Sequence, residues 1–356
     1  MRIMVMGTGD FAVPTFKKLI ADSRHEIMGL VAIQPPETPE NNSRATSNAA
    51  VSPGIVVDTL RPGAGARKRR EASPMEKVAL EKKINIFYTD NVNSFSFYRF
   101  LYLAQTDLLF VCDFGKILSA QILDSTKYGG INLHGSLLPK YRGAAPVHWA
   151  ILNGEKTTGI SIILMTSKLD GGPIIAASDP IPIGPKETVL EVERKLANLG
   201  ADIVLKTIER MESDEHLPII GQQETAVSHA PKIKKQDGLI DWAKPAEYIR
   251  NHYRAMYPWP ASYTFWHSAD GKTLRLKLGP FTVVTHPQET GQPGKVLVAD
   301  GHTLLIAAGQ GAVRVERVHP DGKKPMESAA FMRGYNIKPG DIFGEIRARR
   351  EWMEKS

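Results

Sequence analysis

Asn132 and His134 are the residues whose types and spacing point most directly to chemistry. They occupy alternate positions of a predicted strand, so both side chains should point to the same face. An amide can donate hydrogen bonds to a developing oxyanion, and an imidazole can donate or accept a proton. Because open α/β sheets place ligands at the carboxyl ends of their parallel strands, the pair could act together on one atom. The alternative is that both residues are structural, and the pair alone does not exclude it.

A glycine-rich turn, Gly-Thr-Gly-Asp-Phe-Ala from Gly7 to Ala12, is a second candidate site. It matches the dinucleotide fingerprint, in which glycines let the backbone approach a pyrophosphate. A nicotinamide site also needs an acid at the end of the second strand to hold the ribose, but Leu30 to Gln34 contains none. We therefore interpret the turn as a tight connection that lets the first helix approach the sheet, and we expect no NAD.

The elements that must position these residues alternate between short apolar runs and amphipathic segments. This alternation predicts a parallel sheet wrapped by helices, a Rossmann-like α/β fold. The predicted strands are Arg2 to Met6, Glu26 to Ile33, Ile84 to Tyr88, Leu108 to Cys112 and Gly130 to Leu133.

A hairpin and a long helix should complete this first domain. Thr158 to Met165 and Pro173 to Ala177 flank Lys168 to Gly172, whose paired glycines suit a tight reversal at the sheet edge. Thr188 with Glu191 is a capping-box signature. An apolar face at helical spacing follows, formed by Val192, Leu196, Leu199 and Ile203. The helix should end near Met211.

The remaining chain changes in texture. Residues 212–230 are polar, are interrupted by Pro218 and Gly221, and lack periodicity, which predicts a linker. Short alternating runs then predict a small antiparallel, OB-like β-barrel. Those runs are Leu274 to Leu278, Lys295 to Val298, Thr303 to Ala307 and Ala312 to Val318. We predict domains over 1–211 and 231–346, with a charged tail over 347–356.

Composition limits the class of protein. The 356 residues are 42% hydrophobic and 23% charged, which is typical of a globular protein. No apolar run approaches the roughly 18 residues of a membrane span. Cys112, the one cysteine, ends an apolar run, so we interpret it as a buried apolar residue rather than a catalytic thiol. We expect a cytoplasmic monomer without a membrane partner.

A long loop, 34–73, separates the second strand from Pro74 and is rich in Pro, Asn, Ser and Gly. Loops of this length are usually functional or disordered. From Gly63 to Lys83 there are seven Lys and Arg against three acids, including the contiguous Arg67, Lys68, Arg69 and Arg70. With a net charge of +7, this cluster favours a polyanionic partner, although a solvated insertion is the alternative.

The stretch Ile131-Asn-Leu-His-Gly-Ser-Leu-Leu-Pro-Lys-Tyr-Arg-Gly-Ala-Ala-Pro146 resembles the folate-dependent formyltransferase family. In that family an Asn-x-His strand is followed by Ser-Leu-Leu-Pro and, further along, by an Asp. The match extends through 1–211 and includes Lys168-Leu-Asp-Gly-Gly172 and Phe114-Gly-Lys-Ile-Leu118. The resemblance implies Asn132, His134 and Asp170 as catalytic residues. It also implies a 10-formyltetrahydrofolate site lined by Phe114, Gly115, Ile117, Leu118, Ser136, Leu137, Leu138, Pro139, Gly171 and Gly172.

The second domain is similar to that of family members that formylate methionine on initiator tRNA. The matching segments are Asp241-Trp242, Asn251 to Ala255, Pro258-Trp-Pro260 and His319 to Met326. Amino-sugar formyltransferases share the catalytic strand and a similar Pro-Trp-Pro region, so these segments do not choose the acceptor. The tRNA-acting members also resemble this chain in a basic insertion before a Ser-Pro, here Ser73-Pro74, although this loop is longer. The resemblance therefore implies that Arg67 to Arg70 bind initiator methionyl-tRNA.

The reaction implied is attack of a neutral amine on a formyl carbon. Asn132 can donate to the oxyanion, His134 can donate to the same oxygen or protonate the departing folate nitrogen, and Asp170 can accept the amine proton. No His, Cys and carboxylate cluster at ligand spacing accompanies these residues, so no metal is implied. The alternatives left open are an amino-sugar formyltransferase, an NAD-linked oxidoreductase and an RNA-binding protein on an inactive enzyme scaffold.

Overall fold

The computed structural model describes residues 1–33, 56–57, 71–213, 217–268, 271–288 and 290–344. The chain divides into two compact units. Unit 1 comprises Met1–Pro146, Thr158–Ile181 and Glu193–Pro231, and unit 2 comprises Val147–Thr157, Pro182–Val192 and Lys232–Ser356. The predicted tRNA-binding cluster, Arg67 to Arg70, and the charged tail 347–356 lie outside the described residues. No helix within the described ranges is long and apolar enough to cross a membrane.

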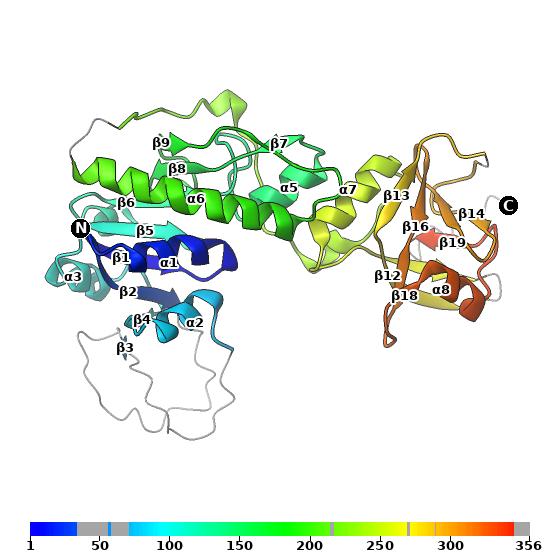
Figure 1. Ribbon diagram of the computed structural model, residues 1–356, viewed down its shortest axis with the longest axis horizontal. Coiled ribbons are helices and arrows are strands. Elements are labelled where there is room, and N and C mark those ends of the chain that lie inside the picture. Colours follow the sequence, from blue (N-terminus) through cyan, green and yellow to red (C-terminus); the bar gives the residue numbers. More distant parts are fainter. Residues whose placement is uncertain (34–55, 58–70, 214–216, 269–270, 289, 345–356) are drawn as a thin grey trace, which may run out of the picture. The chain divides into compact units, whose positions relative to one another are not determined.

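An eight-stranded sheet forms the centre of unit 1, in the order β3-β4-β2-β1-β5-β6-β8-β9 (Figure 1). Its strands are β1 (Arg2–Gly7), β2 (Glu26–Ile33), β3 (Val56–Val57), β4 (Ile86–Thr89), β5 (Leu108–Cys112), β6 (Gly130–His134), β8 (Ser161–Leu164) and β9 (Ile174–Ala177). Neighbours from β4 to β6 are parallel, while β3 and the β8–β9 hairpin are antiparallel. The predicted strands, the parallel sheet and the edge hairpin are therefore confirmed.

Helices cover both faces of this sheet. They are α1 (Val13–Ala21), which follows the 3-10 turn η1 (Asp10–Ala12), α2 (Pro74–Glu81), α3 (Phe95–Leu103), α4 (Ala120–Leu123) and α6 (Val189–Glu212). Phe97 of α3 and Ile122 of α4 join Met4 and Leu109 in one hydrophobic core. On the other face α6 packs closely on β6, because a Cβ at Gly200 would lie only 2.9 Å from the Leu133 side chain.

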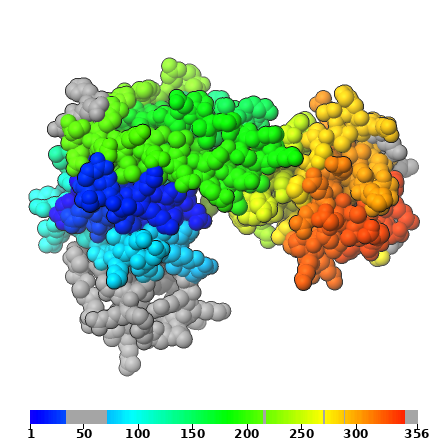
Figure 2. Space-filling model, in the orientation of Figure 1, coloured from blue at the N-terminus to red at the C-terminus, as the bar shows by residue number. Residues whose placement is uncertain are grey.

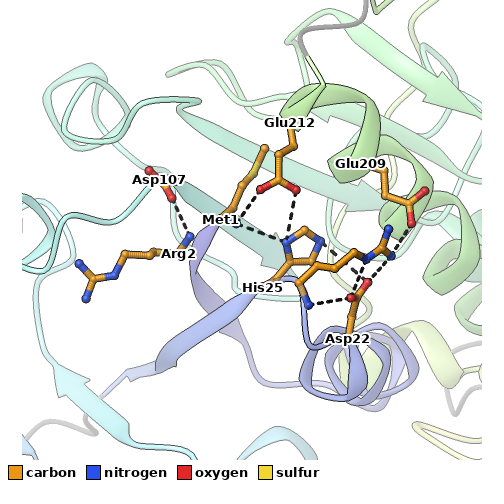
Figure 3. A network of polar contacts seen from close by, with 8 residues as sticks. Met1, Arg2, Asp22, His25, Asp107, Glu209 and Glu212 are labelled. Atoms are coloured by element: carbon orange, nitrogen blue, oxygen red, sulfur yellow. Dashed lines mark hydrogen bonds and ion pairs between the residues drawn. The ribbon is translucent and has the colours of Figure 1, made fainter.

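The long helix α6 lies beside α1, as the ribbon and the space-filling surface both show (Figures 1 and 2). An ion pair between Lys18 and Asp202 joins the two helices. Further along α6, Glu209 pairs with Arg24, and Glu212 lies 2.9 Å from the amino group of Met1 (Figure 3). These contacts fix α6 against the start of β1 and the turn that precedes β2. The predicted end of the helix near Met211 is confirmed.

Unit 2 contains two antiparallel sheets, in the orders β18-β17-β12-β11-β19 and β13-β16-β15-β14. The strands are β11 (Tyr263–His267), β12 (Thr273–Leu278), β13 (Phe281–Val284), β14 (Val296–Ala299), β15 (Leu304–Ala307), β16 (Ala312–Val315), β17 (Arg317–Pro320), β18 (Met326–Glu327) and β19 (Ile342–Gly344). Its helices are α5 (Pro146–Leu152), α7 (Ala246–Met256) and α8 (Ser328–Tyr335), with the 3-10 turn η3 (Lys235–Gly238). The 3-10 turn η2 (Glu224–Ala226) belongs to unit 1. A short pair, β7 (Thr157–Thr158) with β10 (Ile181–Pro182), completes the sheets. The small antiparallel second domain is confirmed.

The core of unit 2 contains Trp242, Trp266, Phe331 and Phe343. Beside it, α7 carries buried polar residues that are paired. Arg254 donates from Nη2 to the Gly184 carbonyl at 2.7 Å and from Nε to the Glu187 carbonyl at 2.7 Å. Asn251 accepts from Arg254 Nη1 at 2.9 Å. The family-like segment Asn251 to Ala255 thus serves the packing of unit 2, because these donors would otherwise be buried without partners.

The segment 217–231, which overlaps the predicted linker 212–230, is hydrogen-bonded to the rest of unit 1. Ile220 and Ile174 exchange two backbone hydrogen bonds, at 2.9 and 3.0 Å. Further on, the Arg142 N–H donates to the Ser228 carbonyl at 2.8 Å, and the Ala230 N–H donates to the Arg142 carbonyl at 2.7 Å. Polar composition and missing periodicity indicated a connection, but they carried no sign of these pairings.

Candidate functional site

The end of β6 places Asn132 and His134 on one face of the sheet, as their spacing predicted. Leu133 between them points to the opposite face, where its side chain meets Gly200 of α6. His134 is buried, with 4% of its surface exposed, whereas Asn132 is half-buried. The neighbouring strand β5 runs parallel, with Val111 opposite Asn132, so the residues after Cys112 share this edge of the sheet.

Asp170 reaches the same place from the connection between β8 and β9. Its Oδ1 accepts a hydrogen bond from Asn132 Nδ2 at 3.3 Å, and its Oδ2 accepts one from the Gly143 N–H at 2.8 Å. Its backbone has φ of 48°, in the left-handed region that Asp tolerates better than most residues. The structure therefore brings together the three side chains named from the sequence, from positions 38 residues apart.

His134 is oriented by a backbone carbonyl. Its Nε2 lies 2.9 Å from the Tyr141 oxygen, and since a carbonyl only accepts, Nε2 must carry the proton. Nδ1 then faces Asp170, with 3.7 Å between Nδ1 and Oδ2, beyond hydrogen-bond range but within ion-pair range. Any proton that His134 gives up on this side must leave from Nδ1, so the imidazolium is the donating form.

The segment expected to line the folate site after β5 divides into packed and accessible residues. Leu118 is fully buried and Phe114 is 6% exposed, and both belong to the core beneath α3 and α4. Ile117 is 50% exposed, and Gly115 turns the chain with φ of 71°. Of the four residues expected to line the site, Ile117 and the backbone at Gly115 are therefore the ones accessible to a ligand.

The segment Ser136 to Pro139 is fixed from beneath by hydroxyl groups. Ser136 donates to the Lys140 carbonyl at 2.6 Å, while Ser161 donates to the Ser136 carbonyl at 2.9 Å and accepts from the Leu138 N–H at 3.0 Å. Leu138 is buried, whereas Leu137 and Pro139 are half-buried. Ser136 thus shapes the turn, and its hydroxyl proton is donated to the Lys140 carbonyl rather than to a ligand.

Gly171 and Gly172 shape the loop that carries Asp170. A Cβ at Gly172 would lie 1.8 Å from the Leu164 carbonyl oxygen, so only glycine lets the two sides of the hairpin approach here. A Cβ at Gly171 would lie 3.0 Å from the Lys168 side chain, which is tight but adjustable. The paired glycines predicted from the sequence as a reversal therefore have a direct steric reason.

The glycine-rich turn Gly7 to Ala12 lies at the end of β1 and faces Asp113. A Cβ at Gly9 would lie 2.4 Å from Asp113 Oδ2, and Thr8 donates to the Asp113 carbonyl at 2.8 Å. Partial removal of water by the surrounding protein, together with the negative charge of Asp10, raises the pKa of Asp113 to about 6. Part of the Asp113 side chain remains in contact with solvent. Burial, with Asp113 and Asp10, raises the pKa of the half-buried Glu193 to about 7. These acids oppose the binding of a pyrophosphate, which needs a positive environment.

Cys112 is fully buried, and burial raises its thiol pKa well above the usual range, so the interpretation as an apolar residue is confirmed. No group of three or more His, Cys, Asp or Glu in the described ranges is arranged to hold a metal ion. Tyr141 contacts His134 and Gly143 contacts Asp170, and the sequence pattern alone does not indicate either role. Gly143 could have been noticed as a glycine beside a predicted site.

The chain matches two family descriptions, "Formyl transferase" over residues 1–208 and "Formyl transferase, C-terminal domain" over residues 232–336. Among curated relatives, the methionyl-tRNA formyltransferase of Methylacidiphilum infernorum is 34% identical over 97% of this chain and 98% of that protein. The methionyl-tRNA formyltransferase of Bacillus velezensis is also 34% identical, over 97% of this chain and 98% of its own length.

Solved structures share the fold at lower identity. The sugar 3N-formyl transferase WlaRD, crystallised in the presence of dTDP and 5-N-formyl-THF, has a TM-score of 0.59 at 16% identity, over 91% of this chain and 99% of that one. HypX from Aquifex aeolicus, in complex with tetrahydrofolic acid, has a TM-score of 0.53 at 16% identity, over 93% of this chain and 47% of that one. With both family descriptions matched in order and relatives 34% identical along nearly the whole chain, this protein belongs to the formyl transferase family.

Proposed function

We propose that this protein transfers a formyl group from 10-formyltetrahydrofolate to the amino group of methionine on initiator methionyl-tRNA, for translation initiation. The observation that carries the proposal is the convergence of Asn132, His134 and Asp170 at the end of β6. The full-length similarity to relatives named methionyl-tRNA formyltransferase supports the choice of acceptor. Two structures of the same fold, one in complex with tetrahydrofolic acid and one in the presence of 5-N-formyl-THF, are consistent with the donor.

The donor would lie along the edge formed by the ends of β5 and β6. Ile117 and the Gly115 backbone would contact the folate from one side, and Leu137, Pro139 and Gly171 from the other. Phe114, Leu118, Ser136, Leu138 and Gly172 would act from behind as supports for these parts. Mixed contacts of this kind suit a flat heterocycle, which binds through apolar surface with a few polar groups that fix its orientation.

The first chemical step is attack of the methionine amine on the formyl carbon, which turns the formyl oxygen into an oxyanion. One N–H of Asn132 is directed to Asp170, and within the described residues no protein group takes the other. That second N–H would donate to the oxyanion. Removing one such donor typically costs about 3 kcal/mol of transition-state stabilisation.

Proton transfers complete the reaction. The attacking nitrogen gains a positive charge and loses one proton, which Asp170 would accept directly or through a water. The bond from the formyl carbon to the folate nitrogen then breaks, and that nitrogen needs a proton. His134 would supply it from Nδ1, because Nε2 is held by the Tyr141 carbonyl. The products are the formamide and tetrahydrofolate, so the atoms balance.

The acceptor would be held in part by Arg67, Lys68, Arg69 and Arg70, through the phosphates of tRNA. Each neutralised phosphate releases counterions, so the affinity for tRNA should fall steeply with salt, whereas folate binding should respond far less. Replacing all four residues with Ser should weaken tRNA binding and flatten the salt slope by a few units while the folate dissociation constant stays constant. An unchanged tRNA affinity and slope would make the loop a solvated insertion.

A formyltransferase for an amino sugar nucleotide is the second candidate, favoured by the fold shared with WlaRD. The two functions are separated by offering 10-formyltetrahydrofolate with charged initiator tRNA and, separately, with aminated nucleotide sugars. We expect formylmethionine on the tRNA and no formylated sugar. Turnover of the sugar alone would reject the tRNA assignment and leave the catalytic residues in place.

A further inference from the structure

A side chain outside the sequence-predicted site holds the loop that carries Asp170. Gln222 Nε2 donates to the Asp170 carbonyl at 2.7 Å and to the Gly172 carbonyl at 2.7 Å. Its Oε1 accepts from Arg142 Nε at 3.0 Å. Because carbonyls only accept and Arg only donates, these three partners fix the orientation of the amide. Gln222 therefore uses both of its N–H groups on the two residues that flank Gly171.

The loop that Gln222 holds is not one that the chain adopts easily. Asp170 has φ of 48°, and an ordinary L-residue in the left-handed region costs about 1–2 kcal/mol. Conformations of this kind persist where surrounding contacts over-determine them. Two hydrogen bonds to the backbone around Asp170 are contacts of this type, and the Asp170 carboxylate is aimed at Asn132 and Gly143 from this backbone.

The segment that supplies Gln222 also holds the second loop of the site. Ser228 Oγ accepts from the Tyr141 N–H at 2.9 Å, and the Ser228 carbonyl accepts from the Arg142 N–H at 2.8 Å. The carbonyl of Tyr141 in turn orients His134, and the N–H of Gly143 orients Asp170. A Cβ at Gly143 would lie 2.5 Å from the Ala230 carbonyl oxygen, so this approach depends on glycine.

We propose that Gln222 is a positioning residue for formyl transfer, and that Ser228 gives a second, weaker point of support. The segment 217–231 would then orient Asp170 from the backbone of its own loop and His134 through the Tyr141 carbonyl. This inference rests on the proposed function, because it assigns Gln222 through the reaction of Asp170. Arg142 is the link within the support, since it is 8% exposed and donates to both Gln222 and Glu224.

The test compares Gln222→Met with Gln223→Met in the full-length protein. Methionine matches glutamine in length but has no N–H, so the first variant removes the two donors to the loop. Gln223 is the adjacent residue of the same type and is exposed, so its variant is the matched control. Gln222→Glu adds a second test, because it keeps the size and the acceptor for Arg142 but removes the same two donors.

We expect Gln222→Met and Gln222→Glu to lower kcat by about tenfold to a hundredfold, since small misplacements of reacting groups have effects of this size. KM for the folate should rise by a smaller factor than kcat falls, because the held loop gives the donor site only Gly171, whereas its Asp170 takes part in the reaction. Gln223→Met should keep wild-type values. Ser228→Ala should show a smaller fall in kcat than the Gln222 variants.

Hydrogen exchange at the amides of Gly171 and Gly172 gives a readout that does not depend on turnover. Exchange should be faster in Gln222→Met than in Gln223→Met. Unchanged exchange, or faster exchange with wild-type kcat, would overturn the assignment of Gln222 as a positioning residue. If the wild-type protein formylates neither charged tRNA nor an aminated sugar, the proposed function fails. The exchange measurement is independent of that result: faster exchange in Gln222→Met shows that Gln222 holds the loop, and unchanged exchange shows that it does not.

Discussion

Two places at the carboxyl edge of the same sheet looked like ligand sites in the sequence, and the structure makes them different. At the end of β1, the Gly7 to Ala12 turn is pressed against Asp113, so its glycines bring backbone and side chain of the protein together. At the end of β6, Asn132 and His134 meet Asp170, and the second N–H of Asn132 has no partner among the described residues. A spacing of glycines can serve packing, whereas converging polar side chains with unused donors indicate chemistry.

The charges around the glycine turn and around the end of β6 also differ, and they too favour the end of β6 as the ligand site. Around the glycine turn, Asp10, Asp113 and Glu193 form a group in which the pKa values of Asp113 and Glu193 are raised to about 6 and about 7. Around Asp170, by contrast, the Gly143 N–H, the Asn132 amide and the His134 ring all face the carboxylate. The first setting penalises a further negative charge, whereas in the second the N–H groups of Asn132 and Gly143 stabilise the carboxylate of Asp170.

The largest effect should come from the end of β6. Asn132→Ala, His134→Ala and Asp170→Asn should each lower kcat by roughly a hundredfold or more, with the fold intact by circular dichroism. Because the three residues act as a unit, a double variant should lose less than the product of the single losses. Near wild-type turnover in any single variant would remove that residue from the site and break the contrast with the glycine turn.

Ligand-induced stabilisation tests the same contrast by binding. A ligand of the folded state at 100 times its dissociation constant stabilises the protein by about 2.7 kcal/mol. We therefore expect tetrahydrofolate to raise Tm by several degrees and NAD to leave it unchanged. The control is Asn132→Ala, which should still respond to the folate because its loss falls on the transition state. A clear shift of Tm with NAD would show that the glycine turn binds a dinucleotide despite its acids.

Much of the site could be predicted from the sequence because its parts are local. Asn132 and His134 share a strand, and alternation along a strand fixes their common face. Gly171 and Gly172 mark a reversal for a steric reason that holds in many hairpins. The parallel strands of unit 1, four strand-forming runs of unit 2 and the helix α6 were visible through their periodicity, because each buries one apolar face. Strands β11, β13, β18 and β19 of unit 2 were not predicted.

Contacts between distant segments were not predictable in this way. Gln222 lies in a polar stretch without periodicity, and nothing in its neighbours indicates the carbonyls of Asp170 and Gly172. The helix α7 was also missed, because Asn251, His252 and Arg254 are buried with partners and so interrupt the apolar pattern expected of a helix face. For Gln222 and Arg254 the information lies in hydrogen-bond partners far along the chain.

A smaller effect is expected from Gly9→Ala in the glycine turn. The new Cβ would lie 2.4 Å from Asp113 Oδ2, so the carboxylate must turn away, which a flexible side chain can do at modest cost. Tm should fall by a few degrees, and kcat should stay within about twofold of the wild type. Thr15→Ser, in α1, is a control for a mild change nearby. A loss of kcat comparable to that of Asn132→Ala would move the turn into the active site.

The smallest effect concerns the pH dependence of stability that Glu193 contributes. Its pKa of about 7 in the folded protein, against an ordinary value of 4.5, means that the folded state binds the proton more tightly than the unfolded state. Its contribution to stability is therefore fully present below about pH 4.5 and is lost as the pH rises through about 7. Glu193→Gln stays neutral and removes this loss, so Tm should fall less between pH 5 and pH 8 than in the wild type. Glu81→Gln, at an exposed side chain of α2, should follow the wild type. If Glu193→Gln shows the same pH dependence of Tm as the wild type and the Glu81→Gln control, the pKa of Glu193 is not raised in the folded protein. The group of acids around the glycine turn would then not oppose the binding of an anionic ligand.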